Sequence, residues 1–243
     1  MPGSSGRFLL LGSGEFEEWA GEAELEALAG AAGDGSVVVL ATASAPEGEA
    51  VFRRWNSQGL AHYERLGRLA VALPVRTRED AQVAANADQV RRASMVFFSG
   101  GNPSYLRQTL VGTSLLAAIG DLLRQGGVFG GCSAGAMVAG AITPGAQRGR
   151  LPSGQGLGLL PQEVFGVHWD AALMRPWRRL VAARTPAGCR FLGIAERTAI
   201  CGSSRGWRVH GRGQVDVRHL GEAHAYSDGE IIPGLEAEHP ANP

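Results

Sequence analysis

The sequence contains no lysine, because all 23 residues counted as Lys plus Arg are arginines. This absence excludes a Schiff-base lysine, the lysine of a phosphate-binding loop and a lysine that activates a catalytic serine. Excess charge is lacking as well, since 23 Asp and Glu residues bring the formal net charge to zero. A neutral chain without a basic block gives no electrostatic reason to expect nucleic acid or a membrane surface as a partner.

Long apolar runs and cysteines are also scarce. No run approaches the roughly 20 residues of a membrane-spanning helix, and Phe8–Leu11 is too short for the core of a signal peptide. The three cysteines, Cys132, Cys189 and Cys201, lack metal-ligand spacing, and the six histidines are scattered. We therefore expect no metal, no other cofactor, and reduced thiols in a cytoplasmic protein.

Short apolar runs alternate with helical stretches over the first two-thirds of the chain. Strands are expected at 7–11, 36–41, 69–73, 94–98 and from 127, and helices at 17–32, 50–66, 80–92 and 106–125. Continuous apolar strands separated by helices favour a parallel sheet that is covered on both faces. The length and an apolar content of 44% predict one α/β domain over residues 1–243, built as a doubly wound, mostly parallel sheet flanked by helices.

The segments become shorter after residue 190. They predict a terminal strand and a C-terminal hairpin rather than a second domain, and they comprise Phe191–Ile194, Ala199–Cys201, Trp207–Val209 and Gln214–Arg218. The ordered core is expected to cover about residues 7–232, with a flexible tail after it.

The strongest local signal is Gly131-Cys132-Ser133-Ala134-Gly135, which follows a short strand and precedes a helical run. This is the pattern of a nucleophile elbow, in which glycines allow a tight turn that presents the serine hydroxyl at the edge of the sheet. The N–H of Ala134 would then donate to a developing oxyanion. An ordinary glycine-rich connection between a strand and a helix is the alternative.

A second glycine loop follows another expected strand, in Phe98-Ser99-Gly100-Gly101-Asn102. The carboxyl ends of parallel strands share one edge of the sheet, where ligands bind. The second oxyanion donor is therefore expected from this loop, from the N–H of Gly101 or else of Gly100. A simple turn that ends a strand is the alternative.

Four segments together resemble one family in their order and sequence. They are the two glycine loops, Val167-His168-Trp169, and Gly193-Ile194-Ala195-Glu196-Arg197-Thr198-Ala199, and Leu11-Gly12-Ser13-Gly14-Glu15 adds to them. This order is similar to that of the peptidase E and cyanophycinase family, over roughly residues 7 to 218. The resemblance implies serine-peptidase activity and a fold like that of class I glutamine amidotransferases.

The resemblance also implies catalytic roles. Ser133 matches the nucleophile, and His168 matches the general base that takes its proton and returns it to the leaving amine. Cys132 stands where the family often has threonine, beside the apex of the elbow rather than on it.

The acid that orients the histidine is less clear, because the stretch from Ala134 to Gln162 contains neither Asp nor Glu. Glu196 matches an acidic position of the family and is our first choice. Asp170 is the second choice, or else a ligand for a substrate amine, and Glu163 is expected on the surface. Glu196 could instead form a structural pair with its neighbour Arg197.

Substrate recognition departs from cyanophycinase. Pro103 and Gly166-Val167 replace residues by which those enzymes bind their polymer, so we do not expect digestion of cyanophycin. The Gly-Gly-Asn form, with Asn102, is closer to peptidase E, which removes an N-terminal aspartate from short peptides. Arg175 and Arg178 are the expected partners of an acidic substrate group, or they solvate a helix face.

The leading hypothesis is a serine hydrolase that cleaves a peptide or isopeptide bond of a small, acidic, Asp-containing peptide substrate. Two alternatives stay open: a binding or regulatory module without turnover, and an acyl-transfer enzyme of specialised metabolism. Nothing in the sequence decides the oligomeric state, and a homodimer is left open.

Overall fold

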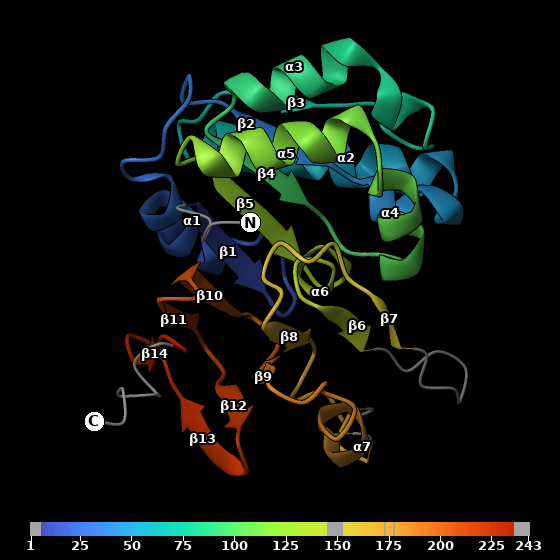
Figure 1. The fold of residues 1–243 in the computed structure, drawn as a ribbon. Helices are drawn as coiled ribbons and strands as arrows, with labels where there is room; N and C mark the ends of the chain where they lie inside the picture. Colours follow the sequence, from blue (N-terminus) through green and yellow to red (C-terminus); the bar gives the residue numbers. More distant parts are fainter. Residues whose placement is uncertain (1–5, 145–152, 173, 177, 236–243) are drawn as a thin grey trace.

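An eight-stranded mixed sheet forms the centre of the computed structural model, which describes residues 6–144, 153–172, 174–176 and 178–235 (Figure 1). From one edge to the other its strands are β14 (Ile231–Pro233), β11 (Gly206–Gly211), β10 (Thr198–Ser203), β1 (Arg7–Leu11), β5 (Val128–Cys132), β4 (Met95–Phe98), β2 (Val37–Leu40) and β3 (Ala70–Ala72). The five strands β1, β5, β4, β2 and β3 are mutually parallel. Beyond β1, the strands β10, β11 and β14 each pair antiparallel with the preceding strand in this order. This confirms the predicted α/β fold with a mostly parallel sheet.

Both faces of the sheet are apolar, since side chains alternate between the faces along each strand. In β1, Phe8 and Leu10 belong to one buried cluster and Leu9 and Leu11 to another. The first cluster includes side chains of α3 (Ala84–Arg92) and α5 (Ser114–Arg124), and the second includes those of α1 (Gly21–Leu28) and α2 (Glu49–Arg65). Two covered faces explain why the strands read as continuous apolar runs.

Apart from α2, which has the predicted length, the helices are shorter than the sequence predicts. The single helix expected at 106–125 is two helices, α4 (Pro103–Leu110) and α5, because Gly112 has φ +71° and the Thr113 side chain caps α5. Short 3-10 segments precede α1 and α3, at Glu18–Ala20 and Asp80–Gln82, and a third lies at Thr42–Glu47. The remaining helices are α6 (Ala134–Met137) and α7 (Arg178–Ala182).

The C-terminal part contains the predicted hairpin, formed by β10 and β11, and also a second sheet that the sequence did not predict. A second sheet has the order β13-β12-β9-β8, with β8 (Glu163–Gly166), β9 (Arg190–Ile194), β12 (Val215–His219) and β13 (Glu222–Tyr226). Strand β9 pairs with β8 and β12, whereas β10 and β11 extend the main sheet. A short pair, β6 (Ile142–Pro144) and β7 (Ser153–Gln155), completes the strands described. From residue 236 on, the predicted tail lies outside the described residues.

Glu163 was predicted on the surface, and this prediction was wrong. Its side chain is 1% exposed and contacts the fully buried Arg190 at 2.5 Å, between neighbouring positions of β8 and β9. Trp207 Nε1 donates to the same carboxylate at 3.1 Å. The sequence around Glu163 does not reveal its burial, because an ion pair between two strands that are distant in the chain has no local sequence signal.

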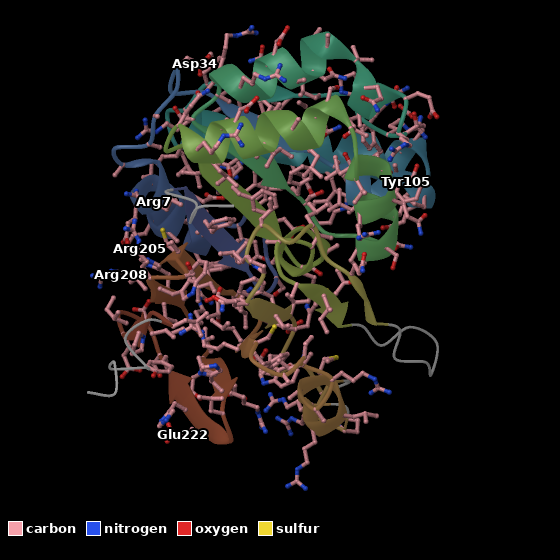
Figure 2. The ribbon with its side chains drawn as sticks, viewed as in Figure 1. Arg7, Asp34, Tyr105, Arg205, Arg208 and Glu222 are labelled. Carbon is pink, nitrogen blue, oxygen red and sulfur yellow. The ribbon has the colours of Figure 1, made fainter. Side chains whose placement is uncertain are left out.

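Most other charged side chains lie at the periphery, as Arg7, Arg208 and Glu222 illustrate (Figure 2), although Glu24 is buried in contact with His62. Within the described part of the chain, no helix has both the length and the apolar character needed to cross a membrane.

Candidate active site

Ser133 lies in the tight turn between β5 and α6, at the carboxyl edge of the main sheet (Figure 1). Its backbone has φ 50° and ψ −109°, a region that residues other than glycine rarely adopt. The Ser133 N–H donates to the carbonyl of Leu11 at 3.0 Å, which ties the turn to the end of β1. Strained backbone of this kind is concentrated at functional sites.

The glycines of the elbow permit close backbone approach. A Cβ on Gly131 would lie 2.4 Å from the carbonyl carbon of Gly135, and one on Gly135 would lie 2.3 Å from the Phe98 oxygen. A side chain on Gly131 would push α6 away from β5, and one on Gly135 would push α6 away from the end of β4. The glycine spacing is therefore required by the geometry, as the elbow pattern predicts.

His168 follows β8 and reaches the serine. Its Nε2 lies 3.0 Å from Ser133 Oγ, and its own backbone has φ 51°. The next residue, Trp169, donates its backbone N–H to the Ile194 carbonyl at 3.0 Å and so anchors the loop to the end of β9. The imidazole side chain is 40% exposed, so the pair is open to solvent and to a substrate.

Glu196 follows β9 and contacts the other nitrogen of the same ring. Its Oε1 lies 3.2 Å from His168 Nδ1. The two residues meet because β8 and β9 are parallel and pair Gly166 with Gly193, so that both loops leave the same edge. With the proton on Nδ1, the ring presents an acceptor to the Ser133 hydroxyl, the tautomer that a general base needs.

Asp170 supports this contact indirectly. Its Oδ1 accepts a hydrogen bond from the backbone N–H of Glu196 at 2.6 Å. The two candidate acids are therefore linked, and of the two it is Glu196 that contacts the His168 ring. The alternative pairing of Glu196 with Arg197 is not the one found: Arg197 Nε contacts Glu17 at 2.8 Å.

The two expected oxyanion donors lie on the loops that flank the serine. Gly100 packs against Ser133, since a Cβ on it would be 3.4 Å from Ser133 Cβ, but its N–H donates to Glu15 Oε1 at 2.8 Å. Among the described residues we find no acceptor for the N–H of Gly101 or of Ala134. Of the two glycines, Gly101 is therefore the one whose N–H has no acceptor among the described residues.

Cys132, the last residue of β5, is buried within the cluster that contains Leu9 and Leu11. Burial, with the nearby charge of Glu15, raises the pKa of the Cys132 thiol well above its usual range. A thiol that stays protonated and inaccessible is a poor nucleophile. This agrees with the choice of Ser133.

Of the residues expected to bind the substrate, Asn102 and Arg178 already make contacts within the protein, whereas Arg175 is exposed. Asn102 caps α4, its Oδ1 accepting the Tyr105 N–H at 3.0 Å. Arg178 donates from Nε to the Trp169 carbonyl at 2.5 Å and lies over the Trp169 ring, so it supports the segment after His168. Arg175 is exposed, and in the described part of the chain we find no ion pair for it.

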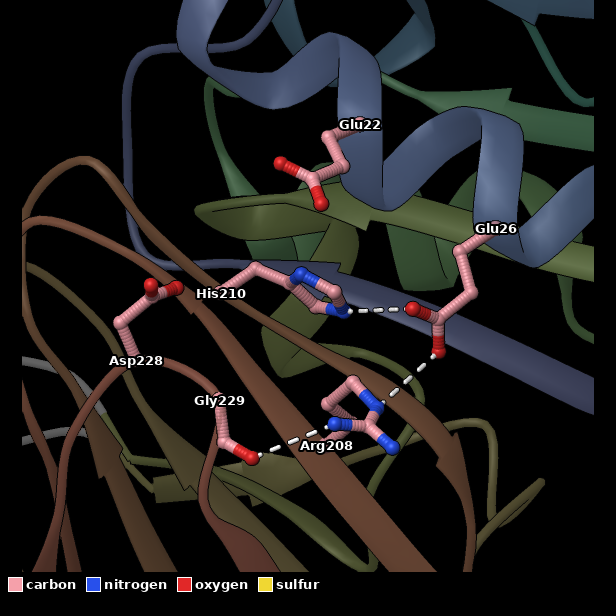
Figure 3. A pocket seen from close by; sticks show the side chains of 6 residues that line it. All are labelled: Glu22, Glu26, Arg208, His210, Asp228 and Gly229. Carbon is pink, nitrogen blue, oxygen red and sulfur yellow. Dashed lines mark hydrogen bonds and ion pairs between the residues drawn. The ribbon is translucent and has the colours of Figure 1, made fainter.

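A hollow of about 280 Å³ lies elsewhere, between α1, β11 and the loop before β14 (Figure 3). Its lining carries the carboxylates of Glu22, Glu26 and Asp228 beside Arg208 and His210, and Glu26 contacts His210 at 3.3 Å and Arg208 at 3.6 Å. None of Ser133, His168 and Glu196 lines it. We find no group of three or more metal-ligating side chains among the residues that the structure describes.

Glu15 is the residue of this region to which sequence reasoning gave no role. Besides Gly100, it accepts a hydrogen bond from Cys132 Sγ at 2.9 Å. Its position after Gly12-Ser13-Gly14 at the end of the first strand was the available signal, because that loop shares the sheet edge with the two glycine loops.

Known proteins are similar to this chain over most of its length. The model of peptidase family S51 matches residues 8–208. A peptidase from an acI-B1 Actinobacterium has 29% sequence identity and a TM-score of 0.84, with 95% of this chain and 98% of that chain covered. A protein assigned to peptidase E from Listeria monocytogenes EGD-e has 17% identity and a TM-score of 0.63, with 86% and 99% covered, and shows the same fold. No curated protein matches the chain.

Proposed function

Because this chain belongs to peptidase family S51, a family of serine peptidases, we propose that it cleaves a small, acidic, Asp-containing peptide through an acyl-enzyme on Ser133. The bond is a peptide or isopeptide bond. The observation that carries the proposal is the 3.0 Å contact between Ser133 Oγ and His168 Nε2 at a strained turn.

The proposed reaction follows from the positions of these groups. As Ser133 Oγ attacks the carbonyl carbon, His168 Nε2 takes its proton and Glu196 stabilises the imidazolium. The N–H groups of Gly101 and Ala134 donate to the oxyanion, and the proton then passes to the leaving amine. Water, deprotonated by His168, attacks the acyl-enzyme, and the acid product leaves as Ser133 regains its proton.

The geometry supports hydrolysis over a module without turnover. Such a module would be favoured by a histidine more than about 5 Å from the serine, with no acceptor on its ring. Both ring nitrogens of His168 instead have a partner, at 3.0 and 3.2 Å. The exposed imidazole is accessible to water and to a second substrate alike, so product analysis separates hydrolysis from acyl transfer.

For the acidic group of the substrate we propose Arg175, with the free donor atoms of Asn102 as a second contact. An exposed guanidinium can bind a carboxylate through two parallel hydrogen bonds. Arg178 is less suited to this role, since its Nε and its ring face are engaged with Trp169. Asp170 has one oxygen engaged by Glu196, which leaves the other for a substrate amine.

We also propose that the enzyme works in the cytoplasm. Its three cysteines are free thiols, as is usual in a reducing compartment. Burial raises the pKa of Cys201 to about 12, so this thiol is almost never the reactive thiolate at neutral pH.

A dipeptide screen tests the substrate. We expect Asp-Xaa dipeptides to be hydrolysed about 10- to 100-fold faster than the isosteric Asn-Xaa dipeptides, because a charge-assisted hydrogen bond is lost in the amide. Replacing Arg175 with alanine should reduce this preference, whereas Arg179→Ala, the matched exposed arginine of α7, should retain it. Hydrolysis that does not distinguish Asp from Asn would contradict the proposed specificity.

Two substitutions test which acid serves His168. Glu196→Gln is expected to lower kcat about 10- to 100-fold, less than in a buried triad, because the Glu196 side chain is 50% exposed and screened. Asp170→Asn keeps an oxygen for the Glu196 N–H, and we expect less than about a 3-fold loss. Steady-state kinetics would settle the choice, and the opposite order would assign the role to Asp170.

A further inference from the structure

We propose that Glu15 is a positioning residue that holds the Gly100–Gly101 loop against the nucleophile elbow. The inference rests on the proposed function, because the loop matters for catalysis only if its N–H group stabilises an oxyanion at Ser133. Glu15 itself touches no reacting atom in this account.

Both carboxylate oxygens of Glu15 are engaged, one by the Gly100 loop and the other by the last residue of β5. Oε1 accepts the Gly100 N–H at 2.8 Å, and Oε2 accepts from Cys132 Sγ at 2.9 Å. Glu15 follows β1, Cys132 ends β5, and Gly100 follows β4, and these three strands are neighbours in the sheet. The side chain therefore reaches across the end of β5 and connects three strand ends.

The position of Gly100 makes this connection relevant to the reaction. The residue packs against Ser133, and the next peptide carries the Gly101 N–H. Gly101 has φ +137°, and a Cβ there would lie 2.4 Å from the Ala43 carbonyl, so the loop also fits closely on its other side. A small shift of this loop would move the oxyanion donor, and a misplacement of about 1 Å can cost about 100-fold in rate.

The second contact requires a protonated thiol, and the surroundings provide one. Cys132 is buried, and burial together with the charge of Glu15 raises its pKa. The thiol is therefore a lasting donor to Oε2 rather than a competing anion. Without this thiol, Oε2 of Glu15 would lose its hydrogen-bond donor beside the elbow.

Labelling of Ser133 by a fluorophosphonate tests the proposal, because this probe needs both the nucleophile and the oxyanion donors. Glu15→Ala is expected to lower the maximal labelling rate about 10- to 100-fold and to leave the half-saturating probe concentration within about 2-fold. Glu15→Gln keeps an acceptor for the Gly100 N–H and should stay within about 5-fold of the wild-type rate. Glu18→Ala, which removes an exposed carboxylate three residues away, should label at the wild-type rate.

The outcomes separate this proposal from its premise. Equal labelling of the wild type and Glu15→Ala, or a loss that matches the unfolded fraction and is shared by Glu15→Gln, overturns the positioning role alone. A wild type that is not labelled at Ser133 overturns the proposed function and this inference with it. Should Glu15→Ala not fold, Cys132→Ala is expected to label more slowly than Cys132→Ser, whose hydroxyl still donates to Oε2; equal rates would overturn the proposal.

Discussion

Replacing Ser133 with alanine is expected to lower kcat about 10⁴-fold or more and to abolish labelling by a fluorophosphonate. Loss of a serine nucleophile removes the covalent pathway altogether, and only binding and the oxyanion donors remain. The fold should be unaffected, because the only side-chain hydrogen bond found for Ser133 in the described residues is the one with His168. We expect the melting temperature to stay within about 2 °C of the wild type.

Two matched variants sharpen this test. Ser57→Ala removes an exposed hydroxyl from α2 and should leave both activity and labelling unchanged. Cys132→Ser should retain most of the activity, which separates the serine from the thiol beside it. Full activity in the purified Ser133→Ala protein would contradict the assignment of the nucleophile.

Replacing Glu163 with leucine is expected to lower the free energy of unfolding by about 3 to 5 kcal/mol, the usual cost of breaking a buried ion pair by removing one partner. The variant leaves the fully buried Arg190 guanidinium without this carboxylate, and Trp207 loses its acceptor as well. For a chain of this size the loss corresponds to a fall in melting temperature of roughly 6 to 20 °C.

Two further variants control for charge and volume. Glu222→Ala removes a carboxylate that is 81% exposed, and it should change the free energy of unfolding by less than about 0.5 kcal/mol. The double variant with Glu163→Leu and Arg190→Met removes both buried charges and should recover part of the lost stability. A Glu163→Leu protein that melts within about 2 °C of the wild type would show that the pair contributes little.

The parts of the fold that were predictable are those with a local cause. The strands β1, β2, β4 and β5 lie within one or two residues of the predicted runs, because a strand buried on both faces must be apolar throughout. The helix boundaries were less accurate. The break between α4 and α5 at Gly112 is not visible in the hydrophobic periodicity, because Thr113 caps a new helix immediately after it.

The same distinction holds for the site. The elbow around Ser133 was visible because its glycine spacing is a local backbone requirement. The partners of the His168 ring were not, since Ser133 and Glu196 lie 35 and 28 residues away from it in the sequence. Only the family resemblance ranked Glu196 above Asp170. In the structure the Glu196 carboxylate contacts the His168 ring, and the Asp170 carboxylate accepts the backbone N–H of Glu196.

The absence of lysine by itself determined that a serine in this chain has no Ser–Lys mechanism, and the glycine pattern determined where a strained turn presents that serine. Both are properties of residue type and of short-range backbone geometry. Tertiary structure decided the rest: that Glu163 is buried with Arg190, that Glu196 reaches His168, and that Glu15 connects three strand ends. These contacts depend on strand order and register, which bring distant residues together and leave no trace in the local sequence.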